Sequence, residues 1–347
     1  MRLRRTVLPV SLWLALIAVA AAPGYAQQTP LPPIEPPKPM PSEQQRSQAT
    51  IQTTTTEVLV PTLVEKHGQV IYGLKQKDFV LEDDGVPQKI HVQEEMDTAP
   101  VALVVAVELG GSSVLEFGKL AKMGPLLDMF LVDPRSRAAL VGFDSGQQLI
   151  CDFTHTSSEL NHALNTLQPG DGGDAILDTV SYAVSLLEDQ PQGYRRVLLL
   201  ISEERDHGSK HAKPADVIRQ IGRTDVLVLS VSFSPAQAEL AQSLSSENEG
   251  GTAANLMTPL LMLIRGMRKN VVKEISDMSG GEYTTFTGDK RFEQRVVNAA
   301  RDTRNRYLIT FSPSNPTPGL HTIRVRTTQD YGAKIVARSD YWLGTGE

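Results

Sequence analysis

Cysteine is nearly absent from this chain, which has one, Cys151, in 347 residues. A single thiol cannot form a disulfide within the chain, even in an oxidising compartment. The strand-like run around it, 148–153, predicts a buried and unreactive thiol rather than a nucleophile. No cysteine comes directly after the N-terminal apolar segment, so lipid attachment at a mature N-terminal cysteine is excluded.

Motifs of catalysis and nucleotide binding are missing as well. The sequence has no Gly-x-Ser-x-Gly elbow, no Walker loop and no dinucleotide fingerprint. No residue set pairs a nucleophile with a base, so we expect a protein that is not an enzyme. Positive charge is not in excess, and the formal net charge of −6 argues against nucleic-acid binding.

The first 26 residues have the pattern of a secretory signal peptide. Arg2, Arg4 and Arg5 precede an apolar stretch, 7–22, and Gly24-Tyr25-Ala26 supplies a small-x-small cleavage pattern. Cleavage after Ala26 would remove three arginines and no acids, which changes the net charge from −6 to −9. The alternative is a retained membrane anchor, although the apolar run is short for a span.

The rest of the chain divides by composition. Residues 27–50 form a proline-rich segment that is expected to be a disordered linker, because proline disrupts helices and sheets. Residues 51–98 and 305–347 are β-rich, and 78–92 has the pattern of a strand, an Asp-Gly turn and a second strand. We expect these two flanks to pair into one small β module.

Residues 99–304 alternate between apolar strand-like runs and helical patterns. Continuous apolar runs of strand length are typical of strands buried on both faces. The runs are 101–107, 138–143, 196–202 and 226–233, and the helical patterns are 115–131, 158–167, 175–187 and 215–221. This alternation predicts an α/β fold with a doubly wound, mostly parallel sheet.

In such a sheet, binding sites form beyond the carboxyl ends of the strands, which directs attention to three loops. They are Glu108–Ser113, Gly170–Asp174 and Glu203–Asp206. These loops resemble those of the von Willebrand factor A (VWA) family, whose metal-ion-dependent adhesion site combines Asp-x-Ser-x-Ser, a threonine and a later aspartate. The stretch Gly172–Asp178 is similar to the family's Gly-Gly-Thr-Ala-Leu-Tyr-Asp run with the threonine changed.

The flanks extend the resemblance. Leu74–Ile90 is similar to the Asp-Gly hairpin of the acidobacterial VWFA-related proteins, and Tyr307–Pro313 and Arg338–Trp342 resemble their C-terminal segments. The resemblance covers the chain from about residue 51 to the end. It implies a VWA fold, similar to the Rossmann type, and a protein that works by binding other proteins.

The family's metal-site positions are filled differently in this chain. Glu108 stands at the first aspartate position, Gly110 replaces the first serine, and Ser112 matches the second. Asp174 replaces the threonine, and Glu203 replaces the last aspartate. The candidate metal ligands are therefore Glu108, Ser112, Asp174 and Glu203, three carboxylates and one hydroxyl where the intact site has two carboxylates and three hydroxyls.

Two outcomes are open for this modified site. Clustered carboxylates repel one another, and a divalent cation would relieve that repulsion, with Ca²⁺ favoured over Mg²⁺ because it tolerates irregular geometry. Alternatively, the site is degenerate and the domain binds by its surface, since a third carboxylate leaves the ion little attraction for a partner's acid. Replacing Gly110 by Ser and Asp174 by Thr is expected to raise Mg²⁺ affinity.

Two further features have alternative explanations. His207 and His211 are four residues apart, which is compatible with zinc on a helix, but Gly208 and Ser209 favour a solvated loop. An apolar, methionine-containing run at 256–267 predicts a helix that packs in the core, or a groove for a partner.

The sequence thus predicts a secreted or periplasmic protein of the cell envelope that binds a protein partner or acts as a scaffold. Nucleic acid is not an expected partner, and no stable membrane span is expected after signal cleavage. The alternatives are metal-dependent adhesion through the modified site and, from another class, a metal-dependent envelope enzyme.

Export gives a direct test. Cleavage after Ala26 predicts a mature chain that begins at Gln27. N-terminal sequencing of the protein isolated from its native host should read Gln27 first, and a cytoplasmic chain that retains Met1 would contradict the prediction.

Overall fold

The apolar runs of the sequence form a six-stranded sheet in the computed structural model, which describes residues 57–93, 99–110, 113, 117–233 and 258–344. Its strands are β6 (Val101–Glu108), β7 (Arg137–Phe143), β8 (Gln147–Thr154), β9 (Arg195–Ser202), β10 (Leu227–Phe233) and β11 (Tyr283–Phe286). The spatial order is β11-β10-β9-β6-β7-β8, and all neighbours are parallel except β7 and β8. The predicted mostly parallel α/β sheet is confirmed.

Strand β6 shows why the apolar runs are continuous. Its alternate residues Val101, Leu103, Val105 and Val107 belong to one buried cluster, and Ala102, Val104 and Ala106 belong to another. Successive strand residues point to opposite faces, so a strand covered on both faces needs apolar side chains at every position.

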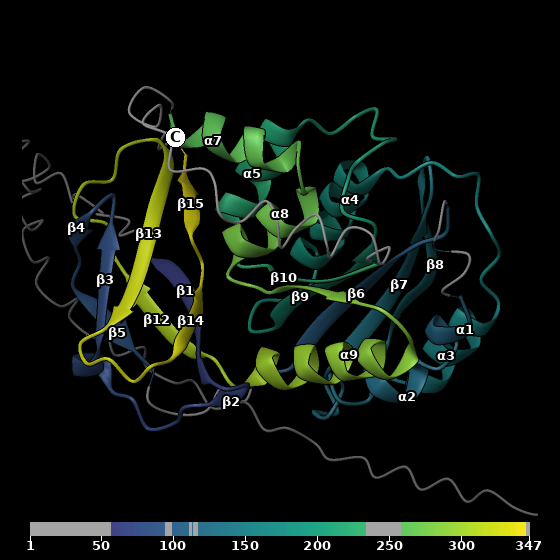
Figure 1. Cartoon of the computed structure of the whole chain (residues 1–347), viewed down its shortest axis with the longest axis horizontal. Helices are drawn as coiled ribbons and strands as arrows, with labels where there is room; N and C mark the ends of the chain where they lie inside the picture. The colour runs from purple at the N-terminus through teal and green to yellow at the C-terminus, as the bar shows by residue number, and fades with distance from the viewer. Residues whose placement is uncertain (1–56, 94–98, 111–112, 114–116, 234–257, 345–347) are drawn as a thin grey trace, which may run out of the picture. The chain divides into compact units, whose positions relative to one another are not determined.

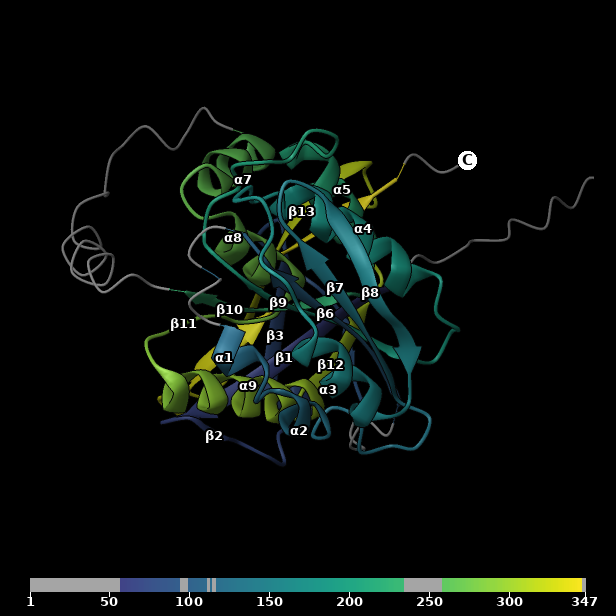
Figure 2. The same cartoon turned by 90° about the vertical axis from the view of Figure 1, so that its right-hand side faces the viewer.

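Helices cover both faces of the sheet (Figure 1; Figure 2). Buried residues of α2 (Gly124–Leu127), α3 (Ser157–Asn165) and α9 (Asp289–Arg304) join the cluster on one face. The other cluster contains buried residues of α4 (Ile176–Glu188), α5 (Pro214–Arg223), α7 (Pro259–Met267) and α8 (Val271–Ser279). In the described part of the chain, no helix is long and apolar enough to span a membrane.

The predicted helix at 115–131 differs from the structure. Its described residues contain two four-residue helices, α1 (Phe117–Leu120) and α2. Pro125 lies in the first turn of α2, where its missing N–H is tolerated, but in the interior of a longer helix the same ring would break the hydrogen-bond ladder. The apolar periodicity is kept, because Leu120, Met123 and Leu127 are all buried.

The two β-rich flanks pair with each other, as predicted. Strands β1 (Val58–Lys66), β2 (Gln69–Val70), β5 (Ile90–Val92), β12 (Tyr307–Phe311) and β14 (Lys334–Ala337) form one antiparallel sheet. Strands β3 (Phe79–Asp83), β4 (Val86–Pro87), β13 (Gly319–Thr327) and β15 (Asp340–Leu343) form a second, and the short helix η2 (Gln76–Asp78) precedes β3. Apolar side chains from both sheets share one buried cluster, so the flanks form a two-sheet β module.

The expected hairpin at 78–92 is present in part. Asp84 and Gly85 make the turn between β3 and β4, and both have positive φ, 49° and 80°. Strand β5, however, leaves the hairpin and pairs with β12 in the other sheet, with Ile90 opposite Phe311. The second half of the predicted hairpin therefore connects the two sheets of the module.

Helix α7 contains the described part of the methionine-containing run, since Leu256 and Met257 lie outside the described residues. Met267 is buried, and Leu260, Leu263 and Ile264 pack against the core. Leu261 and Met262 are 51% and 41% exposed, so core packing explains one side of the helix and leaves two apolar side chains on the surface.

Arg338 joins the β module to helix α5. Its side chain is 4% exposed, and its guanidinium donates to the backbone oxygens of Gly222 (2.7 Å) and Ile221 (3.3 Å) at the end of that helix. It also donates to the backbone oxygen of Asp340 at 3.0 Å and lies 3.4 Å from the Asp225 carboxylate. Burial lowers the pKa of Arg338, and Asp225 partly offsets this effect.

Arg338→Met should therefore destabilise the protein by about 3 kcal/mol, because it leaves buried carbonyl oxygens without donors. Lys122→Met is the matched control, since Lys122 makes an ion pair with Asp289 in which both side chains are at least half exposed. It should destabilise the protein far less than Arg338→Met, because water screens an exposed ion pair. Urea denaturation measures both. Equal losses in the two variants would show that the Arg338 network does not stabilise the fold.

Candidate functional site

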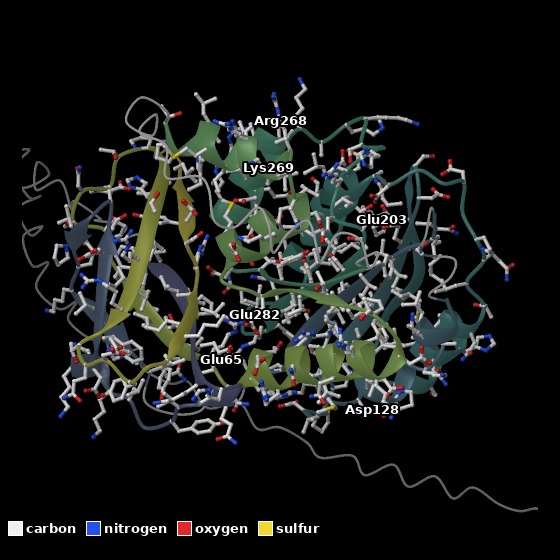
Figure 3. The ribbon with its side chains drawn as sticks, viewed as in Figure 1. Glu65, Asp128, Glu203, Arg268, Lys269 and Glu282 are labelled. Carbon is white, nitrogen blue, oxygen red and sulfur yellow. The ribbon has the colours of Figure 1, made fainter. Side chains whose placement is uncertain are left out.

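The topology places two of the predicted ligands at the switch point of the six-stranded sheet. From β6 the chain proceeds to β7 and β8 on one side, and β9, β10 and β11 follow on the other. Glu108 is the last residue of β6, and Glu203 directly follows β9, its neighbour in the sheet. Figure 3 shows Glu203 on the loop after β9. This position is where open α/β sheets bind ligands.

Glu108 is buried and bonded to the neighbouring loop. It is 1% exposed, and its Oε2 accepts a hydrogen bond of 2.6 Å from the backbone N–H of Glu203. Its Oε1 has no hydrogen-bond partner within the part of the chain that the structure describes. The carboxylate of Glu108 thus fixes the start of the Glu203 loop with one oxygen and has a second oxygen to offer.

Asp174 lies in the loop before α4 and is 6% exposed. Among the described residues, neither of its carboxylate oxygens has a hydrogen-bond partner. Its backbone oxygen accepts a 2.9 Å hydrogen bond from the N–H of His207, which ties this loop to the loop after β9. Asp174 is thus held in place through its backbone, while its side chain is buried without a donor.

The electrostatics of these acids favour protonation. Burial raises the pKa of Asp174 to about 9, with further contributions from the carboxylates of Glu108, Glu203 and Asp206. Burial also raises the pKa of Glu108 to about 7. The hydrogen bond from the backbone N–H of Glu203 lowers this pKa, and the negative charge of the Glu203 carboxylate raises it. Without a cation, Asp174 is therefore neutral at pH 7, which relieves the repulsion that the sequence pattern predicts.

The predicted ligands are only partly brought together. Glu108, Asp174 and Glu203 surround one edge of the sheet, and Ser112 lies outside the described residues. In the described part of the chain, one set of three His, Cys, Asp or Glu ligand atoms lies within 4.8 Å of one another, and it is Asp83, Asp84 and His321 in the β module. The three acids of the modified site do not converge that closely.

Gly110 has a packing role that the sequence did not reveal. A Cβ atom at this position would lie 2.5 Å from the backbone oxygen of Gly173 and 3.1 Å from the Cα of Gly172. A serine here would displace the neighbouring loop. The expectation that Gly110→Ser together with Asp174→Thr raises Mg²⁺ affinity therefore stays a prediction, and a serine at 110 would require the Gly172–Gly173 backbone to shift.

Two aspartates outside the predicted set hold the loop after β9. Asp206 accepts hydrogen bonds from the N–H of Leu177 (3.0 Å) and the hydroxyl of Ser209 (2.5 Å). Asp178 accepts from the N–H groups of residues 210, 211 and 212. Burial opposes ionisation of Asp178, but these three donors outweigh it and keep its pKa below the usual value. The sequence could have pointed to Asp178, because this residue ends the Gly172–Asp178 run that is similar to the VWA family's.

The two histidines and the cysteine remain outside the site's chemistry. His207 and His211 lie in a loop without helix, and their backbone N–H groups bond to Asp174 and Asp178. Cys151 is half-buried on β8 rather than buried. Burial raises the pKa of its thiol, and Glu159 and Asp152 raise it further, which disfavours the reactive thiolate.

Comparison with known proteins supports the VWA fold. Residues 123–259 match the family model of the von Willebrand factor type A domain. The match includes Asp174 and Glu203 and begins after Glu108 and Ser112. Together with the sheet topology, it shows a VWA fold with additional antiparallel sheets from the flanks.

Several solved structures are similar to this chain. Protein BatB from Bacteroides thetaiotaomicron shares 16% identity with a TM-score of 0.39, covering 58% of this chain and 99% of that one. An aerotolerance-related membrane protein from Bacteroides fragilis shares 14% identity with a TM-score of 0.39, covering 58% and 98%. A von Willebrand factor type A protein from Catenulispora acidiphila shares 9% identity with a TM-score of 0.41, covering 84% and 75%. Comparison with curated proteins finds no match.

The protonation of Asp174 predicts a specific pH dependence of stability. Its pKa is about 9 in the folded state against an ordinary value of 3.8, so folding binds a proton in this range and stability falls as pH rises. Asp174→Asn mimics the neutral form. In EDTA, the free energy of unfolding of the variant minus that of the native protein should increase by at least about 1 kcal/mol from pH 5 to pH 8. Each tenfold difference in proton affinity is worth about 1.4 kcal/mol.

Urea denaturation at both pH values measures this difference. The exposed Asp128, labelled in Figure 3, provides the control variant Asp128→Asn, which makes the same substitution at the surface. If the difference in stability between Asp174→Asn and the native protein is the same at pH 5 and pH 8, the claim that Asp174 is protonated at neutral pH is refuted.

Proposed function

We propose that this chain is an exported VWA-type protein that binds a protein partner, or acts as a scaffold, in the cell envelope, and that it does so without a bridging metal ion. The observation that carries the proposal is the side chain of Asp174. It occupies the position of a neutral hydroxyl ligand, and burial raises its pKa to about 9. Asp174 therefore holds a proton at neutral pH, which removes one of the three negative charges of the modified site.

The charge balance explains why a metal bridge is disfavoured. In an intact adhesion site, the cation keeps positive charge that attracts a carboxylate from the partner. Here a cation would have to displace the proton of Asp174, and the resulting three carboxylates with Glu108 and Glu203 would exceed a divalent charge by one. An incoming carboxylate would then meet net repulsion.

One observation favours the alternative, metal-dependent adhesion through this site. Oε1 of Glu108 and both carboxylate oxygens of Asp174 are buried without donors, which is the kind of acceptor a cation satisfies. If an ion binds here, these oxygens would hold it, with Glu203 and Ser112 as the remaining candidates. Ca²⁺ would be favoured over Mg²⁺, because two of the side chains are longer than the family's aspartates.

A catalytic role, as a metal-dependent envelope enzyme, is the second alternative, and the proposal does not include it. Among the hydrogen bonds of the described residues, the carboxylate of Glu108 accepts from a backbone N–H, and neither Glu108 nor Asp174 bonds to a serine, cysteine or histidine side chain. The hydroxyl of Ser209 donates to Asp206, which also accepts a hydrogen bond from the N–H of Leu177 at the start of α4, so this pair has a structural role.

We also propose that the chain belongs to the acidobacterial VWFA-related group. The pairing of its N-terminal and C-terminal flanks supports this assignment.

Affinity capture with and without a chelator separates the two binding modes. With the chain from Gln27 as bait and envelope fractions of the native host as the source, the same partner should be retained in Mg²⁺, in Ca²⁺ and in EDTA. Glu203→Ala should retain it too, because the proposed contact does not pass through a metal. Binding that requires Mg²⁺ or Ca²⁺ and disappears in Glu203→Ala would establish a working adhesion site instead.

A further inference from the structure

A second cluster of metal-ligand side chains lies in the β module, where the N-terminal and C-terminal flanks pair. Asp83 ends strand β3, Asp84 follows in the turn, and His321 is on strand β13. Nδ1 of His321 is 2.8 Å from Oδ2 of Asp84 and 3.6 Å from Oδ1 of Asp83. One ligand atom from each of the three residues lies within 4.8 Å of the other two.

The backbone explains how two consecutive carboxylates reach one point. In a regular strand, neighbouring side chains point to opposite faces. Asp84 instead has a φ of 49° in the turn before Gly85, and this left-handed conformation ends the alternation. The backbone N–H of Asp84 donates to the oxygen of Thr322 at 2.9 Å, which fixes the turn beside His321.

Each of the three side chains has one polar atom that is hydrogen-bonded to a neighbouring residue outside the cluster. The other polar atom of each is the one that lies near the other two side chains. The hydroxyl of Tyr341 donates to Oδ2 of Asp83 at 2.9 Å, and the N–H of Thr322 donates to Oδ1 of Asp84 at 2.9 Å. Nε2 of His321 is 2.6 Å from the backbone oxygen of Thr317, so this nitrogen is the donor. Metal-ligating carboxylates and histidines are typically oriented by such outer partners.

The arrangement leaves one buried acceptor unsatisfied. Oδ1 of Asp83 has no hydrogen-bond partner in the described ranges of the chain, although the side chains of Asp83 and His321 are each 4% exposed. Burial raises the pKa of Asp83, and the bond from Tyr341 and the proximity of His321 only partly offset it. A His321–Asp84 ion pair alone would satisfy Nδ1 and Oδ2 but would leave this oxygen without a donor.

We propose that Asp83, Asp84 and His321 bind one divalent cation of the zinc type. An imidazole nitrogen with two carboxylates suits Zn²⁺ better than Mg²⁺ or Ca²⁺, which prefer oxygen ligands alone. Tetrahedral zinc with ligand bonds near 2.0 Å needs ligand atoms roughly 3.3 Å apart. The distances of 2.8 and 3.6 Å from Nδ1 lie on either side of that value.

The solvent side of the site remains accessible, because the side chain of Asp84 is 50% exposed. A bound ion would have three protein ligands and an open position there for water or an external group. It would also connect the turn after β3 to β13, and so tie together two segments 237 residues apart in the sequence.

Calorimetry with Zn²⁺ on the untagged, chelator-stripped chain tests the proposal. One ion should bind per chain, and the same addition should raise the melting temperature. Asp84→Asn should weaken Zn²⁺ binding at least about tenfold, because it removes a ligand charge. This variant should keep the fold, since asparagine tolerates positive φ and the side chain is at the surface. His321→Gln should have the same effect on binding.

The controls separate this site from the other candidates. Glu203→Gln and His211→Ala should leave Zn²⁺ affinity and stoichiometry unchanged, since neither residue belongs to the cluster. Circular dichroism of the metal-free variants reports whether each has folded. Failure of the native chain to bind Zn²⁺ at micromolar concentration would overturn the proposal. The proposal would also be overturned if Asp84→Asn still bound Zn²⁺ with native affinity while Glu203→Gln or His211→Ala abolished binding.

Discussion

A buried charge without a partner costs several kcal/mol, and this constraint determines the polar architecture of the protein. Three buried ionisable groups meet it in different ways. The guanidinium of Arg338 donates to backbone oxygens at the end of α5 and thereby joins the β module to the α/β core. Asp174 has no donor for either oxygen, and its raised pKa makes the neutral form the stable one. Asp83 has one satisfied oxygen and one that points toward His321.

The position of Asp174 connects this constraint to function. Parallel strands bring the loops after β6 and β9 to one edge of the sheet, where VWA domains have their metal site. In this chain the long side chain of Glu108 bonds to the N–H of Glu203, and the Gly172–Gly173 backbone packs against Gly110. The edge is thereby held together by hydrogen bonds and close packing. The binding mode that we propose therefore uses the loop surfaces themselves.

Much of the fold was predictable from the sequence, because burial on both faces of a parallel sheet requires the continuous apolar run of β6 and its neighbours. The pairing of the flanks was also predictable, from their shared β pattern. The helix at 115–131 was predicted incorrectly, since apolar periodicity does not register the break at Pro125. For the site, the sequence identified Glu108, Asp174 and Glu203. It could not show the protonation of Asp174 or the clash at Gly110, because both depend on distances between loops. The grouping of Asp83 and Asp84 with His321 had no local signal at all.

The central claim is that the carboxyl group of Asp174 is neutral at physiological pH in the absence of metal. Carbon-13 NMR of aspartate side-chain carboxyls, recorded across a pH titration in EDTA, tests it directly. The account predicts one aspartate resonance that titrates near pH 9 and is missing from Asp174→Asn. If every aspartate carboxyl in the native protein has titrated by about pH 6, as ordinary aspartates do, the account is contradicted.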